Sequence, residues 1–298
     1  MIRPLELAVV VPVFNERGNV AVLVERLNAA LAGIGWEAIF VDDDSPDGTA
    51  DAVRAIAHAD PRIRVLQRIG RRGLSTACIE GMCATAAPVV AVIDGDLQHD
   101  ETLLPQLLAR LRDDPALDVA IGSRFVAGGG TGDWADARVA KSALATRLSR
   151  RVLKAELCDP MSGFFAIRTA VLRGVVPRLS GIGFKILLDI LTASPRPLRF
   201  VELPYVFRTR VAGESKLDHV VALEYLLALY DRLFGRVVPV RFAMFSAVGA
   251  IGAGVHLLVL LALFGAGLAF VAATIAATLV AMTFNFALNN ALTYRDRR

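Results

Sequence analysis

Two carboxylates stand two residues apart in Asp94-Gly95-Asp96, and the amide of Gln98 follows after the same interval. Carboxylate and amide oxygens are hard ligands that suit Mg²⁺ or Mn²⁺ bound jointly with diphosphate oxygens. A carboxylate pair is a weak signal when it stands alone, because Asp is also common as a helix cap after a strand. The spacing nevertheless makes Asp94, Asp96 and Gln98 the candidates for a divalent-metal site.

A second acidic group is the run Asp42, Asp43 and Asp44. Three adjacent carboxylates repel one another unless cations or hydrogen-bond donors face them. A nucleobase or a ribose presents such donors. The run therefore favours a nucleotide as the ligand.

Arginines supply the complementary charge. Arg124 follows an apolar segment, and Arg138 follows the glycine-rich stretch 128–134. Guanidinium groups match phosphate in geometry and charge. Each arginine alone is usually a solvated surface residue, but together with a metal-type carboxylate pair they indicate phosphate at both ends of a reaction. Three further cations lie close together in the sequence: Arg208, Arg210 and Lys216.

The elements that must position these groups are short apolar segments separated by longer amphipathic ones. Continuous apolar strands separated by helices indicate a parallel sheet covered on both faces. The polar groups follow the carboxyl ends of these strands, the edge at which ligands bind in an open α/β sheet. We therefore predict an α/β fold whose charged residues converge at one edge of a mostly parallel sheet. Strands are expected at Leu7–Val13, Ala38–Val41, Ile63–Leu66, Val89–Ile93 and Val119–Ile121, and helices at 17–33, 47–58, 73–86 and 102–113.

Several protein classes are disfavoured. The chain has no G-x-G-x-x-G after the first expected strand and no G-x-x-x-x-G-K-[ST], which argues against a dinucleotide oxidoreductase and a P-loop NTPase. The net charge of +4 is not organised into a Lys/Arg run interleaved with aromatics, so we expect no nucleic-acid partner. The three cysteines lack C-x-x-C spacing and indicate a reduced compartment without a zinc site.

The C-terminal part predicts a membrane anchor. No Asp, Glu, Lys or Arg occurs from Phe242 to Tyr294, and Gly265-Ala266-Gly267 divides this stretch into halves of about 20 residues, enough to cross a bilayer. We expect a transmembrane hairpin at 242–264 and 269–292; the alternative is a helical hairpin buried in a soluble core. Arginines flank both ends of the hairpin, which favours cytoplasmic termini. Residues 218–240 are amphipathic and fit either helices at the membrane interface or an ordinary packing helix.

A set of motifs distributed over roughly residues 5–217 resembles glycosyltransferase family two, and within it the dolichol- or polyprenyl-phosphate mannose synthases. The final segment F-N-F-A-L-N-N-A-L-T-Y (284–294) resembles a shortened GtrA-like membrane domain. The motifs that carry the resemblance are V-P-V-F-N-E-R (11–17), V-D-D-D-S-P-D-G-T (41–49), R-I-G-R-R-G-L-S-T-A (68–77), D-G-D-L-Q-H (94–99), G-S-R-F (122–125), D-P-M-S-G-F-F (159–165), G-F-K (183–185) and R-V-A-G-E-S-K-L (210–217).

The resemblance implies a GT-A (Rossmann-like) catalytic domain at 1–217, interface helices at 218–240 and a GtrA-like transmembrane hairpin at 241–298. It implies inverting transfer of one sugar, with mannose and a GDP-mannose donor favoured, to polyprenyl or dolichyl phosphate, with Mg²⁺ or Mn²⁺ as the cofactor. Such an acceptor phosphate is already ionised near neutral pH, so no strong general base is required. Of the four histidines only His99, beside the metal motif, is a candidate for a role.

The family's residue roles are carried over by position. The nucleotide is expected to contact Pro12, Phe14, Asn15, Glu16, Asp42, Asp43 and Asp44. Metal and diphosphate are expected at Asp94, Asp96 and Gln98. The lipid phosphate is expected at Ser123, Arg124 and Arg138, with Arg210 and Lys216 closing over the phosphates. Asp96, Arg124 and Arg138 are the expected catalytic residues. The sequence departs from the family at Phe14 (commonly Tyr), Asp44 (Asn), Ser75 (Gly) and Asp100-Glu101 (a Pro pair).

Alternatives remain open at this point. The donor could be UDP-glucose or another UDP-sugar, or the chain could be a lipid-linked sugar transport or scaffold protein. A processive polysaccharide synthase is disfavoured because neither Trp36 nor Trp134 lies in a Q-x-x-R-W segment. The expected partners are the nucleotide-sugar, the lipid phosphate and the bilayer, and a homo-oligomer stays open. The expected location is a bacterial-type inner membrane, with the catalytic domain in the cytoplasm.

Overall fold

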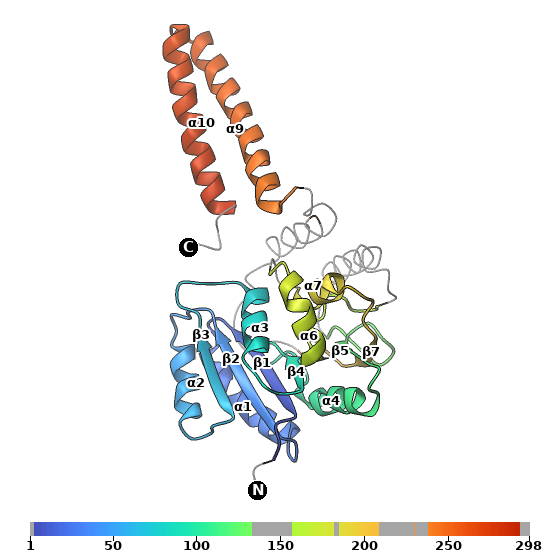
Figure 1. The fold of residues 1–298 in the computed structure, drawn as a ribbon. Helices are drawn as coiled ribbons and strands as arrows, with labels where there is room; N and C mark the ends of the chain where they lie inside the picture. The colour runs from blue at the N-terminus through green and yellow to red at the C-terminus, as the bar shows by residue number, and fades with distance from the viewer. Residues whose placement is uncertain (1–2, 133–156, 182–184, 209–229, 231–237, 293–298) are drawn as a thin grey trace. The chain divides into compact units, whose positions relative to one another are not determined.

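The computed structural model describes residues 3–132, 157–181, 185–208, 230 and 238–292. The chain divides into two compact units, Met1–Ala228 and Leu229–Arg298. The first contains a sheet covered by helices and the second a helical hairpin (Figure 1).

The sheet of the first unit has seven strands in the order β3-β2-β1-β4-β6-β5-β7. All neighbouring pairs are parallel except those of β6, which runs antiparallel to both β4 and β5. The sheet is therefore mostly parallel, as the sequence predicts, with one reversed strand in its middle. The strands are β1 Leu7–Val13, β2 Trp36–Asp42, β3 Ile63–Gln67, β4 Val89–Val92, β5 Val119–Ser123, β6 Phe165–Arg168 and β7 Phe200–Pro204.

Helices follow the strands in the alternation that the sequence predicts, and the four expected helices lie at their expected places. Two short 3₁₀ helices, η1 Glu101–Leu103 and η2 Val176–Arg178, adjoin α4 and α6. The helices of this unit are α1 Arg17–Ala30, α2 Thr49–Ala57, α3 Leu74–Cys83, α4 Leu104–Asp113, α6 Thr169–Val175 and α7 Ile186–Ala193.

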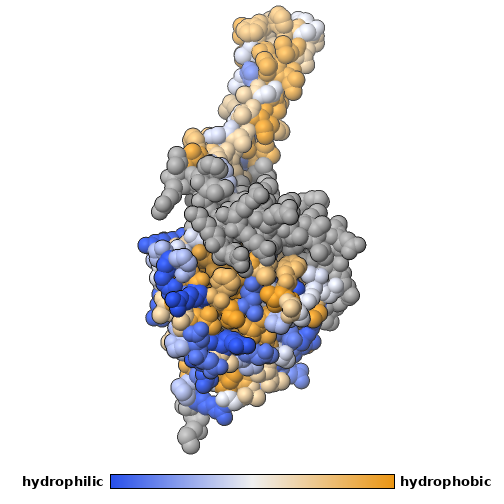
Figure 2. All heavy atoms as spheres, turned by 90° about the vertical axis from the view of Figure 1, so that its right-hand side faces the viewer, coloured by the Kyte–Doolittle hydropathy of each residue, from blue (hydrophilic) through white to orange (hydrophobic). Residues whose placement is uncertain are grey.

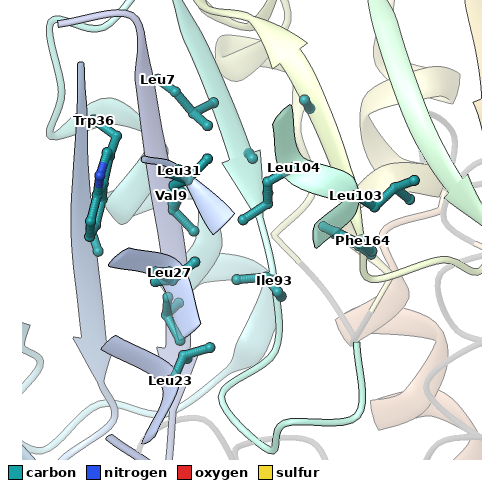
Figure 3. Packing of buried hydrophobic residues seen from close by; sticks show 14 of the residues in the cluster. Leu7, Val9, Leu23, Leu27, Leu31, Trp36, Ile93, Leu103, Leu104 and Phe164 are labelled. Atoms are coloured by element: carbon teal, nitrogen blue, oxygen red, sulfur yellow. The ribbon is translucent and has the colours of Figure 1, made fainter. Parts of the chain in front are cut away.

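The core has two layers because both faces of the sheet are covered. On β1, Leu7, Val9 and Val11 pack in the cluster to which α1 and α4 contribute, while Ala8 and Val10 pack on the opposite face with α3, α6 and α7. Alternate side chains of a strand point to opposite faces, so a strand buried on both faces is apolar at every position. Figure 3 shows the first layer, with side chains of α1 packed against β1 beside Trp36.

The second unit consists of α9 Val240–Gly265 and α10 Phe270–Leu292. The candidate spans, Phe242–Gly265 and Phe270–Asn290, have mean hydropathies of 2.3 and 1.8. Only 11% and 17% of their most apolar windows are buried, and Figure 2 shows apolar surface over much of this hairpin. A hairpin in a soluble core would be mostly buried, so this exposure favours a membrane-spanning hairpin over that alternative.

Small residues form the seam of the hairpin. Ala273, Ala277 and Ala281 of α10 are buried at intervals of four residues, and Asn285 continues the series. Asn285 lies directly against Gly252 of α9, where an added Cβ would be 2.0 Å from the Asn285 Oδ1 atom. The absence of a side chain at position 252 leaves room for the Asn285 amide against α9.

Candidate active site

The carboxyl ends of β1, β2 and β4 lie at one edge of the sheet because the three strands are parallel neighbours. The backbone N–H of Asp43 donates to Val13 O over 3.1 Å, so the acidic run starts beside the end of β1. The same edge receives Asp94 after β4. The prediction that the polar groups of these strands converge at one edge is confirmed.

Asp94 is held by hydrogen bonds and charge. His99 Nε2 lies 3.0 Å from Asp94 Oδ2, and an added Cβ on Gly163 would lie 3.2 Å from the same oxygen. Burial raises the pKa of Asp94, but the hydrogen bond from His99 and the positive charges of Lys185 and Arg124 outweigh it, so the pKa lies below its ordinary value. Asp94 is therefore a carboxylate at neutral pH, stabilised by His99 and by the positive charges of Lys185 and Arg124.

Asp96 and Gln98 lie in a tight turn after Asp94. Asp96 is buried and its Oδ1 accepts from the Gln98 backbone N–H at 3.2 Å, while Leu97 between them has a φ of +63°. A left-handed conformation at a branched residue is rare and occurs mainly where the surroundings impose it. The Gln98 side-chain amide donates to Arg208 O at 3.1 Å, and the Arg208 N–H donates to Gln98 O at 2.8 Å.

These residues fit a divalent metal in the chemistry of their oxygens. Asp94 and Asp96 supply two carboxylates from one strand end, and the absence of a side chain at Gly163 leaves space against Asp94. Within the described residues no group of three or more His, Cys, Asp or Glu side chains forms a metal cluster. A metal here would therefore take remaining ligands from elsewhere, such as phosphate oxygens and water.

The run Asp42–Asp44 receives hydrogen bonds from the chain itself. Asp42 accepts from the backbone and hydroxyl of Ser45, and Asp44 accepts from the N–H of Gly70 at 3.1 Å. Asp43 accepts from Arg68 NH1 at 2.7 Å and from the Gly73 N–H at 2.6 Å. The donors predicted to face these carboxylates are thus present, but the protein provides them.

Asp43 has a higher pKa than a carboxylate on the protein surface. Burial raises the pKa of Asp43 above its ordinary value, although the Gly73 N–H and the Arg68 guanidinium lower it in part. Arg68 is 3% exposed and also donates to Thr76 at 2.6 Å. The loop after β3 is therefore bound rigidly to the end of β2.

The residues after β1 approach the same edge. Pro12 pairs with Val41 inside the sheet, and the ring of Phe14 lies 4.4 Å below the Arg72 guanidinium. Asn15 has a φ of +58°, and its buried Oδ1 has no hydrogen-bond partner in the part of the chain that the structure describes. Glu16 accepts from Asn19 at 2.6 Å. A buried amide oxygen without a partner is costly, and here it lies where a ligand is expected.

Arg124, after β5, is buried and paired. Its Nε and NH2 donate to the two oxygens of Asp159, each at 2.8 Å. Burial lowers the pKa of Arg124, but the bidentate pair with Asp159 outweighs it and the pKa is raised. Asp159 is positioned in turn by Glu202, which accepts its N–H at 2.9 Å. Ser123 beside it is fully buried, and among the described residues its hydroxyl has no hydrogen-bond partner.

Three expected site residues, Arg138, Arg210 and Lys216, lie outside the described residues, as do most of residues 218–240. The structure adds groups to which the sequence assigned no role. Asp159 orients Arg124, and Lys185 donates to Met161 O at 3.2 Å while its charge acts on Asp94. The motifs D-P-M-S-G-F-F and G-F-K contain these residues and were the available signal.

The fold is that of nucleotide-sugar-dependent transferases of the GT-A type. A structure of glucosyl-3-phosphoglycerate synthase from Mycobacterium tuberculosis with Mn²⁺, UDP-glucose and phosphoglyceric acid has a TM-score of 0.60 at 19% identity, over 76% of this chain and 79% of the other. The same enzyme with Mg²⁺ and UDP has a TM-score of 0.56 over the same shares. At this identity the likeness concerns the fold.

Sequence comparison defines the family. Residues 8–175 match glycosyl transferase family 2, and residues 244–298 match the GtrA/DPMS transmembrane domain. A dolichol-phosphate mannosyltransferase of Pyrococcus furiosus is 36% identical over 99% of this chain and 82% of its own length. One of Saccharomyces cerevisiae is 35% identical over 76% and 86%, and a polyprenol monophosphomannose synthase of Mycolicibacterium smegmatis is 33% identical over 70% and 80%. The chain belongs to glycosyl transferase family 2, and it is a membrane-anchored glycosyltransferase.

Proposed function

We propose that this enzyme transfers one mannose from GDP-mannose to the phosphate of a polyprenol or dolichol, with inversion at the anomeric carbon. The observation that carries the proposal is the 36% identity to a dolichol-phosphate mannosyltransferase along 99% of the chain, including the hairpin. The family match and the polar edge of the sheet agree with it.

The proposed site uses both ends of the polar edge. Asp94 and Asp96 would hold Mg²⁺ or Mn²⁺, with Gln98 beside them, and the ion would neutralise charge on the leaving nucleoside diphosphate. The donor nucleotide would lie along the ends of β1 and β2, where Asn15 Oδ1 has no partner among the described residues. This assignment extends to Pro12, Phe14, Glu16, Asp42, Asp43 and Asp44.

The acceptor phosphate would bind at the end of β5. Arg124 is held in a fixed orientation by Asp159, and Ser123 offers a buried hydroxyl that lacks a partner among the described residues. Arg138, Arg210 and Lys216 are proposed as further phosphate ligands. An ionised phosphate is itself the nucleophile, so catalysis would rest on positioning and charge and not on a general base.

We also propose three segments: a GT-A domain at 1–217, interface helices at 218–240 and the hairpin at 241–298. The division into compact units between Ala228 and Leu229 supports a boundary within 218–240. We propose that the chain is anchored in a bacterial-type inner membrane. Two spans would return the chain to the side from which it started, and the arginines that flank both ends of the hairpin favour the cytoplasm as that side. The catalytic domain and both termini are therefore proposed to be cytoplasmic.

The test is transfer of radiolabelled mannose from GDP-mannose to polyprenyl phosphate by the full chain in detergent, with and without Mn²⁺ or Mg²⁺. We expect metal-dependent labelled lipid, and a loss of about 10²–10³-fold in kcat in Asp96→Asn, the cost of removing one transition-state stabiliser. Asp51→Asn is the matched control, because Asp51 is exposed and pairs only with Arg54 in the contacts described for it.

Each other outcome changes the assignment. Product formed only from UDP-sugars would replace the donor but keep the reaction. Full activity in Asp96→Asn would remove Asp96 from the metal site. Binding of the lipid phosphate without turnover of any nucleotide-sugar would overturn the proposal in favour of a transport or scaffold role.

A further inference from the structure

His99 lies inside an aromatic cluster next to the candidate metal carboxylates. It is 3% exposed, and its ring centroid is 5.2 Å from Phe164, 5.6 Å from Tyr205 and 5.3 Å from Phe207. A polar ring in such surroundings costs free energy unless its nitrogens are hydrogen-bonded. Both nitrogens of His99 are: Nε2 lies 3.0 Å from Asp94 Oδ2 and Nδ1 lies 2.9 Å from Tyr205 Oη.

The chemistry of the partners gives these bonds a direction. The Asp94 carboxylate can only accept, so the hydrogen of this bond is on His99 Nε2. Burial raises the pKa of Tyr205, so its hydroxyl keeps its proton and can donate to Nδ1. A chain of two hydrogen bonds thus runs from Tyr205 through His99 to Asp94 and selects one tautomer of the imidazole.

The far end of this chain is a carboxylate confined on two sides. The side chain of Asp94 is 37% exposed, in contrast to 2% for His99, so it lies at the rim of the cluster and faces the site. Its Oδ2 contacts His99 on one side, and on another it lies where a Cβ at position 163 would be only 3.2 Å away. His99 lies in the loop after β4, Tyr205 after β7 and Gly163 before β6, so segments distant in sequence surround this carboxylate.

We propose that His99 and Tyr205 are positioning residues that hold the Asp94 carboxylate in the orientation needed to bind the metal–diphosphate group. The inference rests on the assignment of Asp94 in the proposed function. Hydrogen-bonded partners of metal ligands commonly set their orientation, and their loss weakens metal binding by about 10–100-fold.

The experiment measures Mn²⁺ binding to the full chain in detergent by electron paramagnetic resonance, in the presence of GDP. We expect His99→Leu to weaken Mn²⁺ binding by about 10–100-fold. Tyr205→Phe, which keeps the ring, should weaken it less. His99→Gln should recover part of the affinity, because its amide can donate to Asp94 and accept from Tyr205. Phe164→Leu is the control, since it alters the same cluster without removing either hydrogen bond.

A double variant separates positioning from packing. His99→Leu combined with Tyr205→Phe replaces both polar partners by apolar groups, a change that can be nearly neutral for stability. A purely structural role predicts that the double variant recovers both thermal stability and Mn²⁺ affinity. A positioning role predicts recovered stability with Mn²⁺ affinity still lost. Imidazole ¹⁵N spectra should show the Nε2-protonated tautomer of His99 in the wild type, and a shifted Nδ1 resonance in Tyr205→Phe, which lacks the hydroxyl that donates to this nitrogen.

The outcomes distinguish this inference from the proposed function. Unchanged Mn²⁺ affinity in His99→Leu, with normal mannose transfer, would overturn the inference alone. His99-dependent Mn²⁺ binding in a chain that transfers no mannose would overturn the donor or reaction alone. If the wild-type chain showed no saturable Mn²⁺ binding with GDP, both the metal assignment in the proposed function and this inference would be overturned.

Discussion

At the scale of single residues, the candidate site depends on a missing side chain as much as on the charged ones. Gly163 faces Asp94, and an added Cβ would lie 3.2 Å from the oxygen that accepts from His99. This distance is tighter than ordinary van der Waals contact, so the carboxylate would have to shift by a few tenths of an ångström.

We therefore expect Gly163→Ala to weaken divalent-metal-dependent activity by about tenfold, as loss of a supporting contact does, while the protein stays folded. The measurement is kcat and KM for the metal ion, with the thermal midpoint recorded in parallel. Gly174→Ala is the control, because a Cβ there would meet no atom within 4 Å. Equal kinetics in the two variants would show that the Asp94 orientation tolerates displacement.

At the same scale, the sequence predicts residue types better than their partners. The run Asp42–Asp44 correctly implied donors, but the donors Arg68 and Gly73 lie 25 and 30 residues away from Asp43 and became visible only in the fold. The bidentate pairing of Arg124 with Asp159 was equally hidden. The sequence does not show whether an arginine is buried or exposed, because burial depends on tertiary contacts that the spacing of residues does not reveal.

At the scale of elements, Asp118 links β5 to the segment before β7 through its carboxylate and to the reversed strand β6 through its backbone carbonyl. Asp118, just before β5, accepts from Arg196 at 2.7 Å and from the Arg199 N–H at 2.8 Å. Its backbone carbonyl accepts from the Arg168 N–H of β6 at 3.1 Å. Burial raises the pKa of Asp118, but the hydrogen bonds and positive charges around it outweigh this, and the pKa is lowered.

We expect Asp118→Asn to lower the thermal midpoint at neutral pH, because the variant loses the interaction that depresses this pKa. A depressed folded-state pKa gives stability that is fully present above the unfolded value of about 4 and is lost as the pH falls through the folded value. The difference between wild type and variant should therefore shrink below about pH 4. Tryptophan fluorescence during heating at a series of pH values measures it, and a constant difference would contradict the assignment.

Strands β1, β2, β4 and β5 could be predicted because burial on both faces makes them almost continuously apolar, and the edge strand β3 could be predicted from its short apolar run despite the exposed Arg64. β6 and β7 were not predicted: β6 has only three apolar residues before Arg168, and β7 is only partly buried, with Glu202 in its middle. The antiparallel pairing of β6 depends on contacts between segments more than 70 residues apart, such as Val90 with Ile167. The local pattern of apolar residues does not indicate with which strands a short strand will pair.

At the scale of the whole molecule, the exposed apolar surface of α9 and α10 requires a non-aqueous environment. Large side chains such as Leu258 (70% exposed) and Phe286 (72%) point away from the seam of the hairpin. The two helices are long and apolar enough to cross a bilayer, and we expect lipid to cover this surface.

We expect the full chain to remain in membranes after alkaline carbonate extraction, and Leu258→Arg to be extracted in part. A charge within a span costs about 2.5–3.5 kcal/mol on insertion scales. Val22→Arg, at a partly exposed apolar position of α1, is the control and should stay with the membrane as wild type does. If Leu258→Arg were retained equally, this helix would not be facing lipid.

The contact between Gly252 and Asn285 has a consequence for how the hairpin can diverge. A side chain at position 252 would occupy the place of the Asn285 amide, so Gly252 can gain one only if the Asn285 side chain turns away or is replaced by a smaller one. In a set of related sequences, a larger residue at 252 should accompany a smaller one at 285. The two positions are therefore expected to covary. If Gly252→Ala destabilises the hairpin, Asn285→Gly should restore its stability.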